Sequence, residues 1–122
     1  MPYVEILAPR AEASRKRELA AVVTRGIVDA FDVSAATVTV YFLPLDAADY
    51  AHEGRFGLPE RGARVFVKVH AYRRSAAQRR AAAAALTPAL AATFDTDSHS
   101  VAVYFLDREP DEVAHDGRLA SD

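Results

Sequence analysis

The chain contains no cysteine and no tryptophan, and only one of its 122 residues is a methionine. Without cysteine the protein has no disulfide bond, no thiolate nucleophile and no cysteine-ligated metal, and it suits a reducing compartment such as the cytosol. No apolar run reaches the length of a membrane-spanning helix, and no basic region followed by an apolar run opens the chain. We therefore expect a cytoplasmic protein that does not bind a membrane.

Neither sign of charge predominates. The chain has 15 lysine and arginine residues against 17 aspartate and glutamate residues, which gives a formal net charge of −2. This balance is not that of a nucleic-acid-binding protein. The four histidines, at positions 52, 70, 99 and 115, lack the close spacing of metal ligands, so we expect no metal.

Hydrophobic residues make up 51% of the chain, which is ample for one core in a single domain spanning residues 1–122. Within that domain the second half of the sequence repeats the first, and residues 1–59 correspond to residues 64–122. Without a gap, Val38–Leu43 aligns with Val101–Leu106, and Ala51–Arg55 aligns with Ala114–Arg118. The chain is therefore predicted to be a duplicated unit.

Each copy has the pattern of a strand, a helix and a second strand. In the first copy, apolar residues recur at helical spacing between Glu12 and Phe31, and Pro44 is expected to end the strand that follows. In the second copy, Ser75 and Gln78 have the spacing of a capping box. The predicted strands are residues 3–8, 37–43, 64–70 and 100–106, and the predicted helices are residues 12–31 and 75–94.

Two such units predict an α+β fold, with a four-stranded mixed sheet that is parallel within each unit and has both helices on one face. Ferredoxin-like modules share this order of elements. The other face of the sheet carries apolar strand residues without a cover, and such a surface predicts association with other chains.

Pro2 stands directly after the initiator methionine, at the start of the first strand. Once Met1 is removed, Pro2 carries a secondary amine in place of an amide, and this makes it a rigid base at the end of a strand. An ordinary α-amino group has a pKa of about 7.7–8.0, and an apolar pocket with arginines disfavours its ammonium form, so such an amine can act as a base near neutrality. The alternative interpretation is a proline that is merely tolerated as the first residue of a strand.

The Met1-Pro2 start, the duplicated βαβ unit and the segment Gly54–Gly57 after the second strand together resemble the tautomerase superfamily. Short members, such as 4-oxalocrotonate tautomerase, have one unit per chain, whereas long members have two and assemble as trimers. This chain resembles the long kind over nearly its whole length. The resemblance implies a homotrimeric, cofactor-independent tautomerase or isomerase in which Pro2 transfers a proton on a small 2-oxo or enol acid.

The resemblance also implies residues that bind the substrate. Arg73 and Arg74 follow the third strand, at about the place where decarboxylases and dehalogenases of the superfamily have an arginine pair that binds a carboxylate in bidentate fashion. Arg10 occupies the equivalent turn in the first copy and resembles an arginine at the end of the first strand in 4-oxalocrotonate tautomerase. Phe56 resembles the aromatic residue that walls the pocket. The alternatives are a solvated arginine cluster and an apolar residue at a subunit interface.

Tyr104 and His115 complete the set of residues that the resemblance implies. Tyr104 matches a dehalogenase tyrosine, and a phenol there is able to donate a hydrogen bond to a developing enolate. His115 stands where the dehalogenase has its water-activating glutamate, and it is a possible acid or base. This departure argues against hydrolytic dehalogenation unless nearby Glu112 or Asp116 substitutes. The alternatives are packing of a strand tyrosine, and a turn or trimer contact made by the histidine.

Two other functions stay open from the sequence. In the first, a protonated Pro2 acts as a general acid in the decarboxylation, hydration or dehalogenation of a small three-carbon acid. In the second, the chain is a catalytically silent trimer or a ferredoxin-like ligand-binding module. A retained Met1 favours the second function, because an acylated proline has no basic lone pair.

Overall fold

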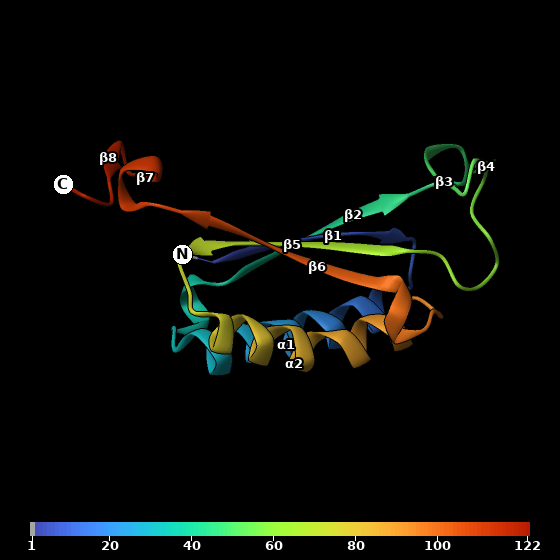
Figure 1. Ribbon diagram of the computed structural model, residues 1–122, viewed down its shortest axis with the longest axis horizontal. Coiled ribbons are helices and arrows are strands. Elements are labelled where there is room, and N and C mark those ends of the chain that lie inside the picture. Colours follow the sequence, from blue (N-terminus) through green and yellow to red (C-terminus); the bar gives the residue numbers. More distant parts are fainter. Residues whose placement is uncertain (1) are drawn as a thin grey trace.

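The computed structural model describes residues 2–122, and its two long helices pack on one face of a four-stranded sheet (Figure 1). Helix α1 (Ala13–Phe31) forms because apolar residues recur every three or four positions and face the sheet. Leu19, Val23 and Ile27 on that face are fully buried. The helix ends at Asp32, whose left-handed backbone lets its N–H close the last turn.

Helix α2 (Ala76–Thr93) begins with the capping box that the sequence predicts. The N–H of Gln78 donates to Oγ of Ser75 at 3.1 Å, and the N–H of Ser75 donates to Oε1 of Gln78 at 3.0 Å. The buried face of α2 includes Ala82 and Leu86 and packs against α1. Within residues 2–122, no helix has both the length and the apolar character needed to cross a membrane.

The main sheet consists of β1 (Tyr3–Pro9), β2 (Thr39–Leu45), β5 (Val65–Tyr72) and β6 (Val101–Arg108). Its strand order is β2-β1-β5-β6. The two strands of each unit are parallel, whereas β1 and β5 pair in antiparallel fashion at the centre, with Tyr3 opposite His70. This arrangement confirms the predicted α+β fold, with a four-stranded mixed sheet and both helices on one face.

Pro44 lies inside β2 and does not end it, so that detail of the prediction is wrong. β2 is an edge strand, and such a strand tolerates a proline where the missing N–H would point away from the sheet. The third and fourth predicted strands are also too short. Pairing between β5 and β6 continues as far as Tyr72 and Arg108, and it carries both strands two residues beyond their predicted ends.

Two short hairpins extend beyond opposite ends of the sheet and form arms (Figure 1). The first arm consists of β3 (Ala51–His52) and β4 (Arg55–Phe56), and the second arm consists of β7 (Ala114–His115) and β8 (Arg118–Leu119). Each hairpin turns through two residues with positive φ, Glu53-Gly54 in the first and Asp116-Gly117 in the second. The 3-10 turns are η1 (Ala35–Thr37), η2 (Ala47–Asp49), η3 (Ser98–Ser100) and η4 (Pro110–Glu112).

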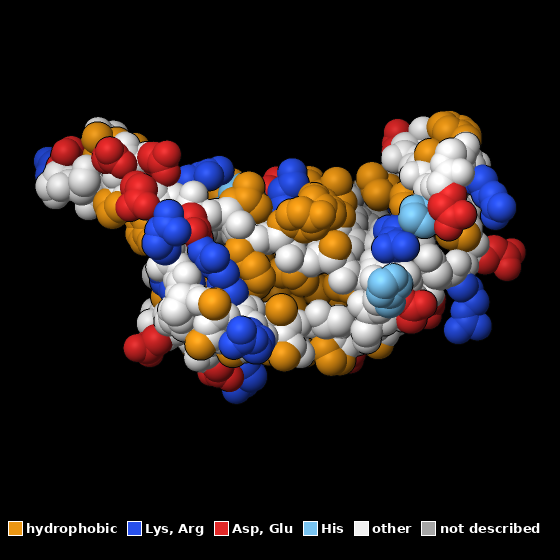
Figure 2. Space-filling view, in the orientation of Figure 1, with side chains coloured by type: hydrophobic (Ala, Val, Ile, Leu, Met, Phe, Trp, Pro, Cys, Tyr) orange, Lys and Arg blue, Asp and Glu red, His pale blue; other side chains and the backbone are white. Residues whose placement is uncertain are grey.

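Alternation along the strands sends one set of side chains under the helices and the other set onto an open face. Val4 and Ile6 on the helix side are buried, whereas Tyr41 and Tyr104 on the open face are 52% and 54% exposed. Figure 2 shows hydrophobic side chains across the middle of the molecule, between the two arms. The sheet therefore has the open, partly apolar face that the sequence predicts.

Gly26 determines how closely the two helices approach. It is buried in α1, and a Cβ atom added there would lie 2.7 Å from Cδ1 of Leu86 and 3.3 Å from Cβ of Ala85. Alanine normally stabilises a helix interior by about 1 kcal/mol relative to glycine. Because Leu86 is itself fully buried and has little room to move, overpacking of roughly 1–3 kcal/mol should outweigh that gain.

We predict that Gly26→Ala lowers the free energy of unfolding, as measured by urea denaturation. Exposed Ala21 on the same helix provides the control, because Ala21→Gly changes helix propensity without touching α2 and should cost about 1 kcal/mol. If Gly26→Ala is instead more stable than the wild type, α1 and α2 move apart at this point without cost and the prediction is wrong.

Candidate functional site

Many of the side chains that are able to transfer a proton or bind an anion lie at one end of the sheet, which we call the Pro2 end. Pro2 is buried immediately before β1, and its carbonyl oxygen accepts a hydrogen bond from the N–H of Thr39 at 3.3 Å. Because β5 runs antiparallel to β1, its last residue, Tyr72, reaches the same end, and β6 ends beside it at Arg108. The start of one central strand and the ends of two other strands therefore meet around Pro2.

Two hollows open at the Pro2 end, and they share two side chains. One, of about 220 Å³, is lined by Pro2, Tyr3, Thr37, Thr39, Tyr41 and His115. The other, of about 290 Å³, is lined by Tyr3 and His115 and by residues of β5, β6 and the second arm. The fold therefore carries His115, a predicted acid or base, from the second arm to the neighbourhood of Pro2.

Arg108 lines the larger hollow, although the sequence analysis does not single it out. Its Nη1 donates to the carbonyl of Asp107 at 3.2 Å, and it forms no ion pair within residues 2–122. An arginine with no carboxylate partner beside a hollow is suited to bind an anion. The first copy has Leu45 at the equivalent position, so the repeat gives no signal that points to this arginine.

Arg73 and Arg74 follow β5 at the Pro2 end but line neither hollow. Arg73 is exposed, and its guanidinium lies 3.2 Å from Oδ2 of Asp107 and 3.6 Å from Oε1 of Glu109. The guanidinium of Arg74 lies 5.0 Å from the ring centroid of Phe31, and its Nη1 donates to a backbone carbonyl. Both predicted substrate-binding arginines are thus engaged by groups of their own chain.

Arg10 follows β1 and therefore lies at the opposite end of the sheet from Pro2. Its Nε donates to Oδ1 of Asp46 at 2.8 Å. This hydrogen bond is the main cause of a lowered pKa of Asp46 and a raised pKa of Arg10. Both groups are therefore charged at neutral pH, and the ion pair is lost as the pH falls through the lowered pKa of Asp46.

Phe56 and Tyr104 also lie away from Pro2 within the chain. Phe56 is 76% exposed on the first arm, which extends from the end of the sheet opposite Pro2. Tyr104 stands on the open face of β6, with its ring centroid 4.5 Å from that of Phe66. A single chain therefore does not bring either residue, or Arg10, to the two hollows at the Pro2 end.

His70 is a second residue at this end that the sequence analysis does not assign to the site. Only 6% of it is exposed, and its Nε2 lies 2.5 Å from Oε2 of Glu5. An ionised carboxylate only accepts hydrogen bonds, so Nε2 is the donor. The imidazole also stacks on the ring of Tyr3, with centroids 4.1 Å apart and an angle of 6° between the planes. These contacts fix the position of Tyr3, the residue next to Pro2.

No protein-family profile and no curated protein matches this chain. A fused 4-OT that forms an asymmetric trimer is 25% identical, with a TM-score of 0.88 over 98% of this chain and 96% of that chain. The protein Pt0534 inactivated by 2-oxo-3-pentynoate is 25% identical, with a TM-score of 0.87 over 98% and 96% of the two chains. Macrophage migration inhibitory factor of Toxoplasma gondii shares the fold, at 17% identity and a TM-score of 0.79 over 96% and 98%.

The fold and these matches place the chain in the tautomerase superfamily, as its amino-terminal sequence and internal repeat predicted. It is similar to fused 4-OT in particular, and it carries two βαβ units in one polypeptide. Together with the two hollows beside Pro2, this likeness makes the Pro2 end the candidate active site.

Proposed function

We propose that this protein is a cofactor-independent tautomerase in which Pro2 transfers a proton on a small 2-oxo or enol acid. Met1 lies outside the described residues, and the mechanism requires its removal, because only then does Pro2 have a free amine. The observation that carries the proposal is the hollow that Pro2 shares with Tyr3 and His115. The likeness to fused 4-OT supports the same reaction class.

The chemistry of Pro2 follows from its burial. A buried amine loses hydration that would stabilise its ammonium form, so the free base is favoured. The base removes a proton from the carbon next to the substrate carbonyl, and an enolate develops. His115, which lines both hollows, is the group that we assign to return the proton at the other position of the enol. The substrate loses one proton and gains one, so the reaction is an isomerisation. Before the next turnover Pro2 releases its proton to solvent and His115 takes one up.

Arg108 is the residue that we assign to the substrate carboxylate. It lines the larger hollow and has no ion pair within residues 2–122, so a substrate carboxylate competes there with no internal carboxylate and only with the backbone carbonyl of Asp107. Its planar guanidinium is able to bind both oxygens of a carboxylate. Arg73 and Arg74 are the alternative, but a substrate that binds them has to compete with Asp107, Glu109 and the ring of Phe31.

We also propose that the protein is a homotrimer. Phe56 and Leu119 are 76% and 41% exposed on the two arms, and the open face of the sheet carries exposed Tyr41 and Tyr104. Exposed apolar surface of this kind favours burial between subunits. The fused 4-OT with 25% identity is a trimer, which supports the proposal. In such an assembly Arg10, Phe56 and Tyr104 contribute to a site only through a neighbouring chain.

Decarboxylation or hydration with a protonated Pro2 is the second candidate function, because Glu112 also lines the larger hollow. A hydratase needs a carboxylate that is free to activate water. Oε2 of Glu112, however, accepts a hydrogen bond from the N–H of Glu109 at 2.8 Å, which holds this carboxylate in the turn at η4. Isomerisation is therefore the favoured outcome.

The first prediction from the proposed function concerns the amine of Pro2. The purified protein should interconvert the keto and enol forms of phenylpyruvate, and 2-oxo-3-pentynoate should abolish that activity. The alkyne next to a carbonyl is electrophilic, and a free secondary amine adds to it without a leaving group. Mass spectrometry should therefore show the intact reagent on the peptide that begins with Pro2.

Two controls separate this chemistry from a general effect. Pro2→Ala keeps a primary amine near the same place and should retain reduced activity, whereas protein that keeps Met1 should be neither labelled nor active. Activity that rises with pH indicates Pro2 as a base, and activity that falls indicates Pro2 as an acid. Full turnover by protein shown by mass to keep Met1 would exclude Pro2 from the mechanism.

The second prediction is that Arg108→Ala lowers kcat/KM by about tenfold to 150-fold, because a charge-assisted contact contributes roughly 1.5–3 kcal/mol. Arg61→Ala serves as the matched control, since Arg61 is exposed in the loop between the units and should leave the kinetics unchanged. If Arg73→Ala reduces kcat/KM while Arg108→Ala does not, the carboxylate binds the arginine that follows β5.

The third prediction is a particle of three times 13.2 kDa in light scattering at micromolar concentration. Phe56→Glu on the first arm should weaken the assembly, because a charge there has to be desolvated at the interface. Val22→Glu on the outer surface of α1 is the control, since Val22 is also exposed, at 43%, and lies away from the arms. A monomer at all accessible concentrations contradicts the proposal, and a dimer favours the ferredoxin-like alternative.

A further inference from the structure

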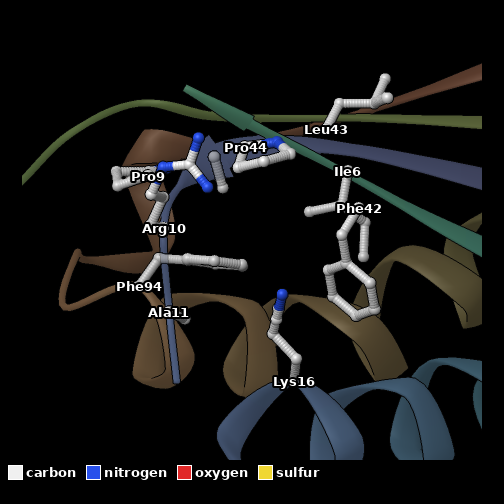
Figure 3. A pocket seen from close by; sticks show the side chains of 10 residues that line it. Ile6, Pro9, Arg10, Ala11, Lys16, Phe42, Leu43, Pro44 and Phe94 are labelled. Carbon is white, nitrogen blue, oxygen red and sulfur yellow. The ribbon is translucent and has the colours of Figure 1, made fainter. Parts of the chain in front are cut away.

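Another hollow, of about 120 Å³, lies at the opposite end of the sheet from Pro2 (Figure 3). It opens between the ends of β1 and β2 and the start of α1. Ile6, Phe42 and Phe94 provide apolar walls, and Arg10 and Lys16 also line it. In Figure 3 the ammonium group of Lys16 projects into the space between the rings of Phe42 and Phe94.

The internal repeat shows which group the second copy places at the equivalent point. Lys16 corresponds to Arg79, and Pro44 corresponds to Asp107. In the second copy the guanidinium of Arg79 contacts the carboxylate of Asp107 directly. In the first copy that carboxylate is missing, and Lys16 forms no ion pair within residues 2–122. Its Nζ lies 5.6 Å from the ring centroid of Phe42.

The two copies also differ in how much space their side chains fill. Arg74, which corresponds to Ala11, places its guanidinium 5.0 Å from the ring centroid of Phe31. Phe94 is the counterpart of Phe31 in the repeat. At the hollow beside Phe94, residue 11 is an alanine and contributes only a methyl group. The first copy therefore lacks the counterparts of the Arg74 guanidinium and the Asp107 carboxylate. The hollow occupies the space that these two groups would fill.

The charge left at this hollow is that of Lys16. Arg10 is already neutralised by Asp46, whose Oδ1 lies 2.8 Å from its Nε. A half-buried ammonium with no counter-ion, set against apolar rings, favours an anion that also brings apolar surface. A cavity of about 150 Å³ holds benzene. A hollow of about 120 Å³ therefore has room for a carboxylate with a short hydrocarbon tail.

We propose that this hollow binds a small aliphatic monocarboxylate. The ligand carboxylate takes the place that Asp107 has in the second copy and pairs with Lys16, and its tail contacts Ile6, Phe42 and Phe94. The inference goes beyond the proposed function and does not depend on Pro2, which lies at the other end of the sheet.

The test is a titration of the full ¹⁵N-labelled protein with sodium propionate, followed by two-dimensional ¹H–¹⁵N TROSY spectra. Sodium chloride at the same ionic strength is the reference. Propionate should cause saturable shifts of the amide signals of Ala11, Phe42 and Phe94, and chloride should not. Equal shifts with both salts, or shifts that do not saturate, would show that only the ionic atmosphere responds and would overturn the proposal.

Two variants test the chemistry of the contact. Lys16→Met keeps a long apolar stem without the ammonium, and Pro44→Asp supplies the carboxylate that the second copy has, so each should weaken propionate binding at least tenfold. Arg17→Met removes the next cation on the same helix, which is exposed, and should leave binding unchanged. Wild-type affinity in Lys16→Met would refute the site, and this variant decides the question even if Pro44→Asp disturbs β2.

Discussion

The antiparallel pairing of β1 with β5 is the contact on which the rest of the structure depends. Within each unit the strands are parallel and are joined through a helix, so in the described part of the chain this pair alone joins the two half-sheets. Its register places Tyr3 opposite His70 and thereby brings the end of β5 beside Pro2. The same register aligns Glu5 and His70 for their partly buried contact. A shift of β1 by one residue would place Tyr3 and Glu5 on the face of the sheet opposite to His70.

Duplication followed by divergence explains why the two ends of this sheet differ. At one end the first unit supplies Pro2, while the second supplies Arg108 and His115, and hollows remain between them. At the other end β5 starts, and the counterpart of Pro2 there is the buried Val65. The first unit supplies Arg10 at that end, and Asp46 neutralises it. The order of elements is the same in both copies. The chemistry is decided by which side chains lack a partner within the chain.

The superfamily and the order of elements were readable from the sequence, because they depend on local pattern and on the repeat. Hydrophobic periodicity specifies the two helices, and the Ser75–Gln78 capping box forms through contacts within one turn. The error at Pro44 has the same origin. From the local sequence alone, a strand is expected to end at a proline. In the structure β2 continues past Pro44, because β2 lies at the edge of the sheet, where a proline is tolerated.

The partners of the charged side chains were decided by the tertiary structure alone. The sequence motifs point to Arg73 and Arg74, yet both guanidiniums are engaged within the chain. Arg108 belongs to no motif, but it lies beside the larger hollow and has no ion pair within residues 2–122. His70 and Glu5 are 65 residues apart and meet only across the β1–β5 pair. A sequence determines which groups are ionisable and which elements form. Whether a group is paired, buried or open to a ligand depends on strand register and on the packing of segments distant in the chain, which local patterns do not specify.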